Sequence, residues 1–220
     1  TEARTAAVSA LSVRHLSRED ASVLAIIGSG VQARSHLEAI SLVRDLNDVR
    51  VWSPSRARVE AFVKEARPQS RARMSAAASA QAAVQDADIV VLVTSAKDPV
   101  VRSEWIADGA HICAVGACRP THREMEATLV ARGELYVDSR DAALVEAGDI
   151  VVAIKEGVIS AAHIKGELGE VVANPAEGRS PADERVTIFK SPGLAVEDVA
   201  APQLIYQRAR DTGKGIEFSL

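Results

Sequence analysis

Residues 23–39 read VLAIIGSGVQARSHLEA, and this stretch decides the fold class. An apolar β run leads into a Gly28-x-Gly30-x-x-Ala33 turn, and the turn opens a helical pattern. Gly28 permits the tight turn, Gly30 lets a pyrophosphate approach the backbone, and Ala33 lets the helix lie close to the strand. The helix N-terminus offers free N–H groups to the phosphates. The candidate contacts for a dinucleotide in this turn are Gly28, Ser29, Gly30, Val31 and Gln32.

Strand and helix patterns alternate on both sides of this turn, which is typical of an α/β fold with a parallel sheet. The expected strands are 22–27, 49–52, 89–93, 111–115, 135–137 and 187–190. The expected helices are 4–16, 31–43, 56–66, 80–85, 124–131, 140–146 and 195–210. After residue 146 the pattern loosens, and residues 174–184 read as a polar surface loop. We therefore predict a Rossmann-type doubly wound parallel sheet.

Composition excludes several classes of protein. Aromatic residues make up only 3% of the 220 residues, so the core must be aliphatic. A net charge of −4 argues against a nucleic-acid binder, and no apolar run approaches the roughly 20 residues of a membrane span. Cys113 and Cys118 have no second pair, which argues against a zinc site or a disulfide framework. Free thiols suit the cytoplasm.

The end of the second expected strand bears on cofactor choice. An NAD site usually has an acidic residue there, which binds the ribose hydroxyls. Here the strand at 49–52 runs into Ser53-Pro54-Ser55-Arg56 instead. No carboxylate is present to repel a 2′-phosphate, and two hydroxyls and a guanidinium can bind one. The prediction is NADP(H) in preference to NAD(H), with Ser53, Ser55 and Arg56 as contacts; alternatively, Arg56 is a solvated residue of the first helical turn.

Two further strand ends should face the cofactor, because ligands of open α/β sheets bind beyond the carboxyl ends of the strands. Thr94 and Ser95 follow the strand at 89–93, and Val115 and Gly116 end the strand at 111–115. We predict contacts with the nicotinamide or its ribose. The alternatives are that Thr94 and Ser95 cap the next turn and that Gly116 is only a turn residue.

Seven blocks follow one another along nearly the whole chain: RTAAVSAL at 4–11, IIGSGVQARSHLEA at 26–39, VRVWSPSR at 49–56, GAHICAVGACRPTHREME at 109–126, YVDSRDAALVEAGDI at 136–150, GELGEVV at 166–172 and TIFKSPGLAVEDVAA at 187–201. In this order they resemble the ornithine cyclodeaminase/mu-crystallin family. The resemblance implies a homodimer in which a Rossmann domain, here 18–190, binds NAD(P).

The resemblance also implies a second domain for substrate and dimer contacts. That domain combines an upstream segment, to which the helix at 1–17 links, with the C-terminal helix and tail, here 191–220. The chain begins at Thr1 inside a helical pattern. We therefore expect the upstream segment, with a Lys and an Arg that face the substrate, to be missing, and the chain to be a fragment.

The resemblance assigns roles to individual residues. Arg4 holds the substrate carboxylate, Glu146 is a pocket acid, and Ser191 contacts the nicotinamide. Without the resemblance, Arg4 would be an exposed helix arginine and Glu146 a helix-end carboxylate. Glu197 and Asp198 are interpreted as charges at a helix N-terminus rather than as catalytic groups.

Cys118 stands where cyclodeaminases of the family carry an aspartate that acts on the substrate amine. A neutral thiol cannot supply that fixed negative charge. The resemblance therefore favours the ketimine reductase-like branch: an NAD(P)H-dependent reductase of small cyclic imino acids such as Δ1-pyrroline-2-carboxylate. Ornithine cyclodeaminase or alanine dehydrogenase activity is one alternative. The other is an NADPH-binding, mu-crystallin-like protein without turnover.

Overall fold

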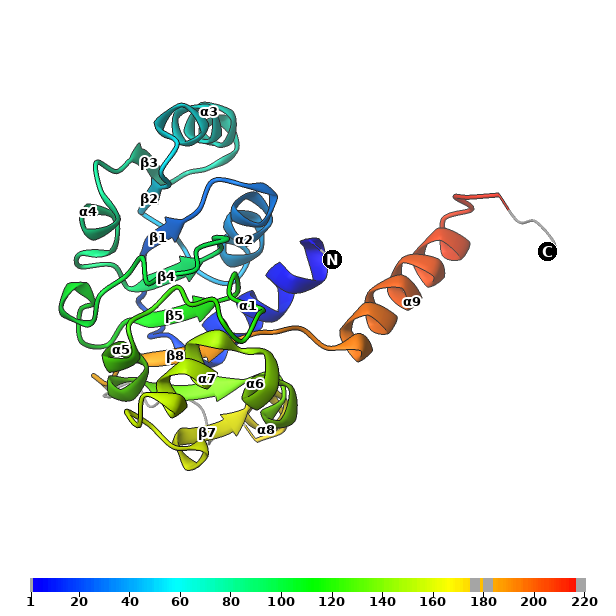
Figure 1. The fold of residues 1–220 in the computed structure, drawn as a ribbon. Coiled ribbons are helices and arrows are strands. Elements are labelled where there is room, and N and C mark those ends of the chain that lie inside the picture. The colour runs from blue at the N-terminus through cyan, green and yellow to red at the C-terminus, as the bar shows by residue number, and fades with distance from the viewer. Residues whose placement is uncertain (1, 175–178, 180–183, 217–220) are drawn as a thin grey trace.

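The computed structural model describes residues 2–174, 179 and 184–216, and these form one parallel sheet with helices on both faces (Figure 1). The order of the strands is β3-β2-β1-β4-β5-β8-β6-β7. Their bounds are β1 (Val23–Ile27), β2 (Asp48–Trp52), β3 (Arg73–Ala76), β4 (Ile89–Leu92), β5 (His111–Ala114), β6 (Glu134–Val137), β7 (Ile164–Glu167) and β8 (Thr187–Lys190). The order in which the chain adds strands reverses between β1 and β4, since β2 and β3 lie on one side of β1, and β4 and β5 on the other, and this is where such sheets bind ligands.

Helices cover the sheet because its strands are apolar on both faces. Along β1, Leu24 and Ile26 face one core, and Ala25 and Ile27 face the other. The first core includes α1 (Glu2–Leu16), α2 (Val31–Ser41) and α3 (Arg56–Ala66). The second includes α4 (Ala80–Val84), α5 (Ala127–Arg132), α6 (Arg140–Glu146) and α7 (Gly148–Lys155). Helix α8 (Leu168–Ala173) packs with Leu16 and Phe189 in a smaller cluster.

Helix α1 packs on the sheet through buried polar side chains. His111 Nδ1 lies 2.9 Å from Thr187 Oγ1, and that hydroxyl donates to the carbonyl of Leu16. The ring therefore donates from Nδ1, and its Nε2 accepts from Cys113 Sγ at 3.5 Å, since the hydroxyl of Ser12, 3.1 Å away, donates to the carbonyl of Ser9. Burial lowers the pKa of His111 to about 3 and raises that of Cys113 to about 12. Both groups stay neutral near pH 7, so they are parts of the fold rather than catalysts.

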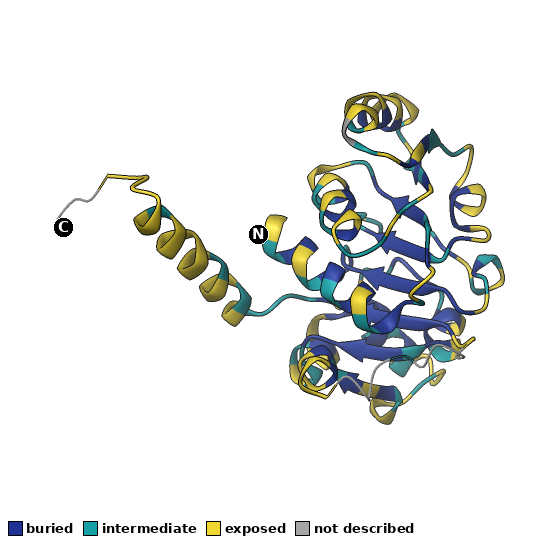
Figure 2. Cartoon of the chain, turned by 180° about the vertical axis from the view of Figure 1, so that it is seen from behind, coloured by how far each residue is buried: buried dark blue, intermediate teal, exposed yellow. Residues whose placement is uncertain are grey.

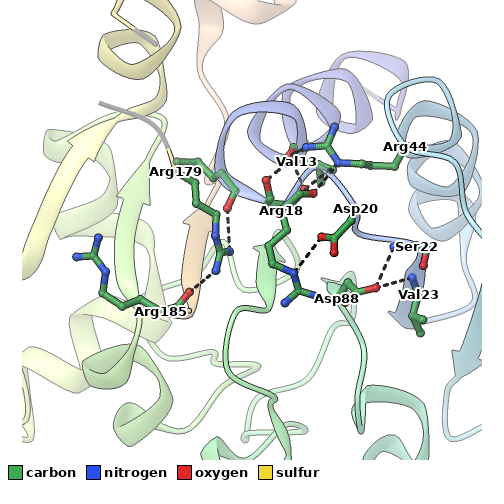
Figure 3. Close-up of polar contacts among 11 residues, drawn as sticks. Val13, Arg18, Asp20, Ser22, Val23, Arg44, Asp88, Arg179 and Arg185 are labelled. Atoms are coloured by element: carbon green, nitrogen blue, oxygen red, sulfur yellow. Dashed lines mark hydrogen bonds and ion pairs between the residues drawn. The ribbon is translucent and has the colours of Figure 1, made fainter. Parts of the chain in front are cut away.

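The C-terminal end of α1 is fixed by arginines (Figure 3). Arg44 donates to the carbonyls of Val13, Arg14 and Arg18, at the end of the helix and just beyond it. Arg18 pairs with Asp88, whose other oxygen accepts the N–H groups of Ser22 and Val23 at 2.9 Å each. The end of α1 is thereby tied to the start of β1.

Helix α9 (Ala195–Asp211) extends away from the sheet, and none of its residues is buried (Figures 1 and 2). Val196, Val199, Ile205 and Tyr206 are all more than half exposed. Among the described helices, none combines the length and apolarity that crossing a bilayer requires.

The predicted elements are present, with three corrections. The helix expected at 124–131 begins only at Ala127, because the backbone of Glu124 donates to Asp149 instead of starting a helix. The region after residue 146, expected to be loose, holds α7, β7 and α8, and the edge strand β3 was not predicted. Most of the loop predicted at 174–184 lies outside the described residues.

Candidate functional site

A pocket of about 290 Å³ lies at the carboxyl ends of the central strands. Seven of the sequence-predicted residues line it: Arg4, Gln32, Thr94, Val115, Gly116, Cys118 and Ser191. Thr5, Val93 and Pro192 complete the lining. Ser95 and Glu146 are exposed and do not line it. The sheet thus brings together side chains that are up to 188 positions apart, from Arg4 to Pro192.

The glycine turn has the geometry that a dinucleotide requires. Gly28 adopts φ +128°, and a Cβ there would lie 2.6 Å from the carbonyl oxygen of Val93. Gly30 caps α2 without a side chain, and a Cβ there would meet nothing within 4 Å. Gln32 adds a buried side-chain oxygen that accepts no hydrogen bond within the described part of the chain. The turn therefore offers open backbone and a spare acceptor, which fits a bound dinucleotide.

The end of β2 carries hydroxyls and no carboxylate. Ser29 Oγ lies 2.8 Å from Ser53 Oγ, which also donates to the carbonyl of Ser55 at 3.3 Å. Arg56 begins α3 and pairs with Glu60 at 2.7 Å on the exposed surface. Exposed helix pairs at this spacing contribute only about 0.3–0.5 kcal/mol, so a ligand phosphate can displace Glu60.

The ends of β4 and β5 are held by a carboxylate that sequence reasoning missed. Glu124 is buried and accepts the N–H of Thr94 at 2.6 Å and of Gly116 at 2.7 Å. A Cβ on Gly116 would lie 2.1 Å from the carbonyl oxygen of Thr94. Gly116 is therefore required by close packing as well as by a turn. Thr94 Oγ1 also accepts the N–H of Ala96, as the capping alternative predicts.

Arg4 enters the pocket from the first turn of α1 with its guanidinium already paired. Its Nη1 lies 2.7 Å from Glu197 and its Nε 2.8 Å from Asp198, both in the first turn of α9. The Arg4 side chain is only 14% exposed, and it packs against Gly193, where a Cβ would lie 2.8 Å from Nη1. The two acidic residues are thus more than charges at a helix N-terminus, because both bind the guanidinium group of Arg4.

Among the residues that the structure describes, neither Cys118 nor Ser191 has the basic partner that a nucleophile needs. Cys118 Sγ donates to the carbonyl of Val115, and desolvation raises the pKa of this thiol. Ser191 Oγ donates to Asp138, which also accepts the N–H of Gly193 at 2.6 Å. Burial raises the pKa of Asp138, but these bonds oppose the shift. The charge of Glu146 acts on Cys118 only by raising the pKa of the thiol further.

Comparison with known proteins settles the family. The sequence model of the ornithine cyclodeaminase/mu-crystallin family matches residues 1–213. The chain belongs to this family. The rat (Rattus norvegicus) ketimine reductase mu-crystallin is 43% identical over 207 residues, which are 94% of this chain and 61% of the rat protein. The chain therefore spans less than two thirds of the length of this relative.

Solved structures of family members have the same fold. The Δ1-pyrroline-2-carboxylate reductase of Thermococcus litoralis, solved with NADH and L-proline, superposes with a TM-score of 0.92 at 36% identity. This match covers 98% of the present chain and 66% of the Thermococcus chain. An archaeal alanine dehydrogenase dimer with bound NAD superposes with a TM-score of 0.91 at 31% identity, again over 98% and 66% of the two chains. The prediction of a Rossmann-type parallel sheet is confirmed.

Proposed function

We propose that the chain is part of an NAD(P)H-dependent reductase of small cyclic imino acids, with Δ1-pyrroline-2-carboxylate as the simplest substrate. The observation that carries this proposal is the pocket, where the Arg4 fork, the strand ends at Thr94 and Gly116, and Ser191 surround one space beside the glycine turn. The ketimine reductase and the pyrroline-2-carboxylate reductase among its relatives support it.

In this proposal the chain binds and orients both reactants. The turn at residues 28–32 holds the pyrophosphate, while Thr94, Val115, Gly116 and Ser191 border the nicotinamide. When bound, the reduced nicotinamide supplies a hydride to the carbon of the C=N bond. The Arg4 guanidinium releases Glu197 and Asp198 and binds the substrate carboxylate instead, since its planar pair of N–H donors matches any carboxylate equally well. Holding two reactants at attack distance can itself supply about 7–11 kcal/mol of the barrier.

Cys118 supports imine reduction over cyclodeamination. A thiol whose pKa is raised is neutral near pH 7 and offers no fixed charge to a substrate ammonium. Reduction of a protonated imine needs no carboxylate at this position.

NADP(H) is the cofactor we propose in preference to NAD(H). At the end of β2 the hydroxyls of Ser29 and Ser53 meet, and the Arg56 guanidinium pairs only weakly with the exposed Glu60, one helical turn further along α3. A 2′-phosphate would accept from these donors, whereas the ribose hydroxyls of NAD(H) would find no carboxylate.

We further propose a homodimer in the cytoplasm. The exposed apolar residues of α9 give a second copy a surface to cover. Both cysteines are free thiols, as a reducing compartment maintains them.

The experiment is an assay of NADPH oxidation with Δ1-pyrroline-2-carboxylate, run beside a fluorescence titration of NADPH binding. Imine-dependent oxidation is expected, and Arg4→Lys, which keeps the charge but loses the fork, should raise KM. Tight NADPH binding without any imine turnover would replace the proposal with a binding function. Ammonia release from ornithine with NAD, at a rate equal to imine reduction, would replace it with cyclodeamination.

A further inference from the structure

A buried group of three charged side chains lies behind the pocket and connects the ends of three strands. Glu124, Asp149 and Lys190, here called the buried triad, are fully or almost fully enclosed. Sequence reasoning had no role for them, and none of them lines the pocket. Glu124 contacts two residues that do, and Lys190 immediately precedes a third, Ser191.

Glu124 joins the ends of β4 and β5. The β4–β5 ladder ends at the pair Leu92 and Ala114, and beyond it the N–H groups of Val115 and Gly116 both turn back to the carbonyl of Leu92, at 2.9 and 3.2 Å. One oxygen of the Glu124 carboxylate accepts the N–H of Thr94 at 2.6 Å, and the other accepts the N–H of Gly116 at 2.7 Å. A buried N–H without a partner is costly, and Glu124 supplies the partner of Thr94 and the shorter of the two contacts of Gly116, so this one side chain links both residues. Both line the pocket, so Glu124 sets the position of that wall.

Asp149 and Lys190 extend the connection to β8. Asp149 Oδ1 accepts the N–H groups of Glu124 and Met125 at 2.7 and 3.1 Å. Its Oδ2 lies 3.1 Å from Lys190 Nζ, and neither of these two side chains is exposed at all. Lys190 is the last residue of β8, and Ser191, which follows it, lines the pocket. The triad therefore spans the ends of β4, β5 and β8.

The triad holds two carboxylates and one ammonium, which leaves one negative charge in excess. Short contacts to two N–H donors are what an ionised carboxylate makes. Burial raises the pKa of Glu124, and the Lys190 ammonium opposes the shift. A negative charge enclosed in protein acts over a longer range than one in water.

That excess charge distinguishes the two redox forms of a nicotinamide. The oxidised ring is cationic and the reduced ring is neutral, so a nearby anion stabilises only the oxidised form. We propose that Glu124 is a positioning residue that fixes Thr94 and Gly116 against the nicotinamide and whose charge favours binding of NADP+ relative to NADPH. The inference rests on the proposed function, because it takes the pocket as the nicotinamide site. The ring becomes cationic as the hydride leaves, so the same charge assists reduction of the imine.

The test compares the affinities of NADP+ and NADPH by calorimetric titration, without any imine present. Glu124→Gln removes the charge and at least one of the two hydrogen bonds. The ratio Kd(NADP+)/Kd(NADPH) should rise about tenfold, which is the effect of one unit charge at about 10 Å in a protein interior. Asp48→Asn is the matched control, because Asp48 is a buried carboxylate at the amino end of β2, paired with Arg50 and Arg73. Its ratio should not change.

A second variant keeps the test open if Glu124→Gln does not fold. Lys190→Met removes the ammonium at similar volume and leaves the excess negative charge larger, so the ratio should fall below that of the unmodified protein. Equal weakening of both cofactors by Glu124→Gln, with no change of ratio in either variant, would show a structural clamp alone and overturn the inference. The proposed function would survive that result, whereas failure of the unmodified protein to bind either cofactor would overturn both.

Discussion

Replacing Gly30 by alanine adds one methyl group where the glycine turn opens to solvent. The backbone at Gly30 has φ −89°, which alanine adopts readily, and a Cβ there meets nothing within 4 Å. Loss of a glycine cap costs helix α2 up to about 1 kcal/mol, and the lower entropy of the unfolded chain returns about 0.4–1 kcal/mol. The free energy of unfolding should therefore stay within about 1 kcal/mol of the original.

Cofactor binding should respond quite differently. A pyrophosphate seated on this turn needs the space that the methyl group takes. Forcing one extra methyl group into a close contact costs about 1–3 kcal/mol. That range corresponds to a loss of NADPH affinity between about fivefold and 150-fold.

The matched comparison is Gly28→Ala. Gly28 adopts φ +128°, and its Cβ would lie 2.6 Å from the carbonyl oxygen of Val93, so this variant should lose stability as well as binding. Urea unfolding and fluorescence titration of NADPH, done on both variants, separate the two effects. If Gly30→Ala binds NADPH as tightly as the unmodified protein does, the turn does not hold the pyrophosphate.

Three further predictions use other parts of the chain. Arg56→Ala should reduce the preference for NADPH over NADH about tenfold or more, since a charge-assisted bond contributes about 1.5–3 kcal/mol. Arg58→Ala, at an exposed position of the same helix, should leave the ratio of the two Kd values unchanged. Equal affinities for the two cofactors in the unmodified protein would contradict the NADP(H) assignment. The folded-state pKa of His111, about 3, lies below its ordinary value of 6.5, so the unfolded chain binds this proton first and stability falls as the pH drops below about 6.5. Between pH 7 and about pH 5 the free energy of unfolding should decrease by about 2 kcal/mol less in His111→Asn, which keeps a donor toward Thr187, than in the unmodified protein. The same pH dependence in both proteins, measured by urea unfolding at each pH, would refute the burial argument. Iodoacetamide should alkylate Cys118 in the folded protein and Cys113 only after unfolding, because burial raises the pKa of Cys113 to about 12; mass spectrometry that found Cys113 modified first would contradict this.

The sequence predicts the parts of this fold that are local in the chain. The β1-turn-α2 unit is recognised because the apolar run, the two glycines and the helical pattern adjoin one another. Strand β7 (Ile164–Glu167) alternates buried Ile and Gly with exposed or half-buried charged residues, too short a pattern to stand out. The place of β8 between β5 and β6 depends on pairings across more than 50 residues, which no local pattern specifies.

The candidate site likewise contains residues that local sequence predicts and residues that only long-range contacts place. Thr94, Gly116 and Ser191 could be predicted because each follows an apolar strand. Glu124 could not, since a carboxylate in the polar stretch REME reads as a surface charge. Its burial depends on two N–H groups 30 and 8 positions away. The pairing of Arg4 with α9 likewise joins residues 193 and 194 positions apart.

Helix α1 carries the pocket arginine at one end and its anchor at the other. Arg44 fixes the last turn, Ser12 and His111 fix the middle, and Arg4 lies on the first turn, about 20 Å from the anchored end. The number of residues between the anchor and Arg4 therefore sets both the reach and the direction of the guanidinium. One residue inserted near Arg4 would turn its side chain by about 100° and leave every anchoring contact in place. Natural variation in α1 should accordingly change the identity of its exposed residues freely while keeping their count constant.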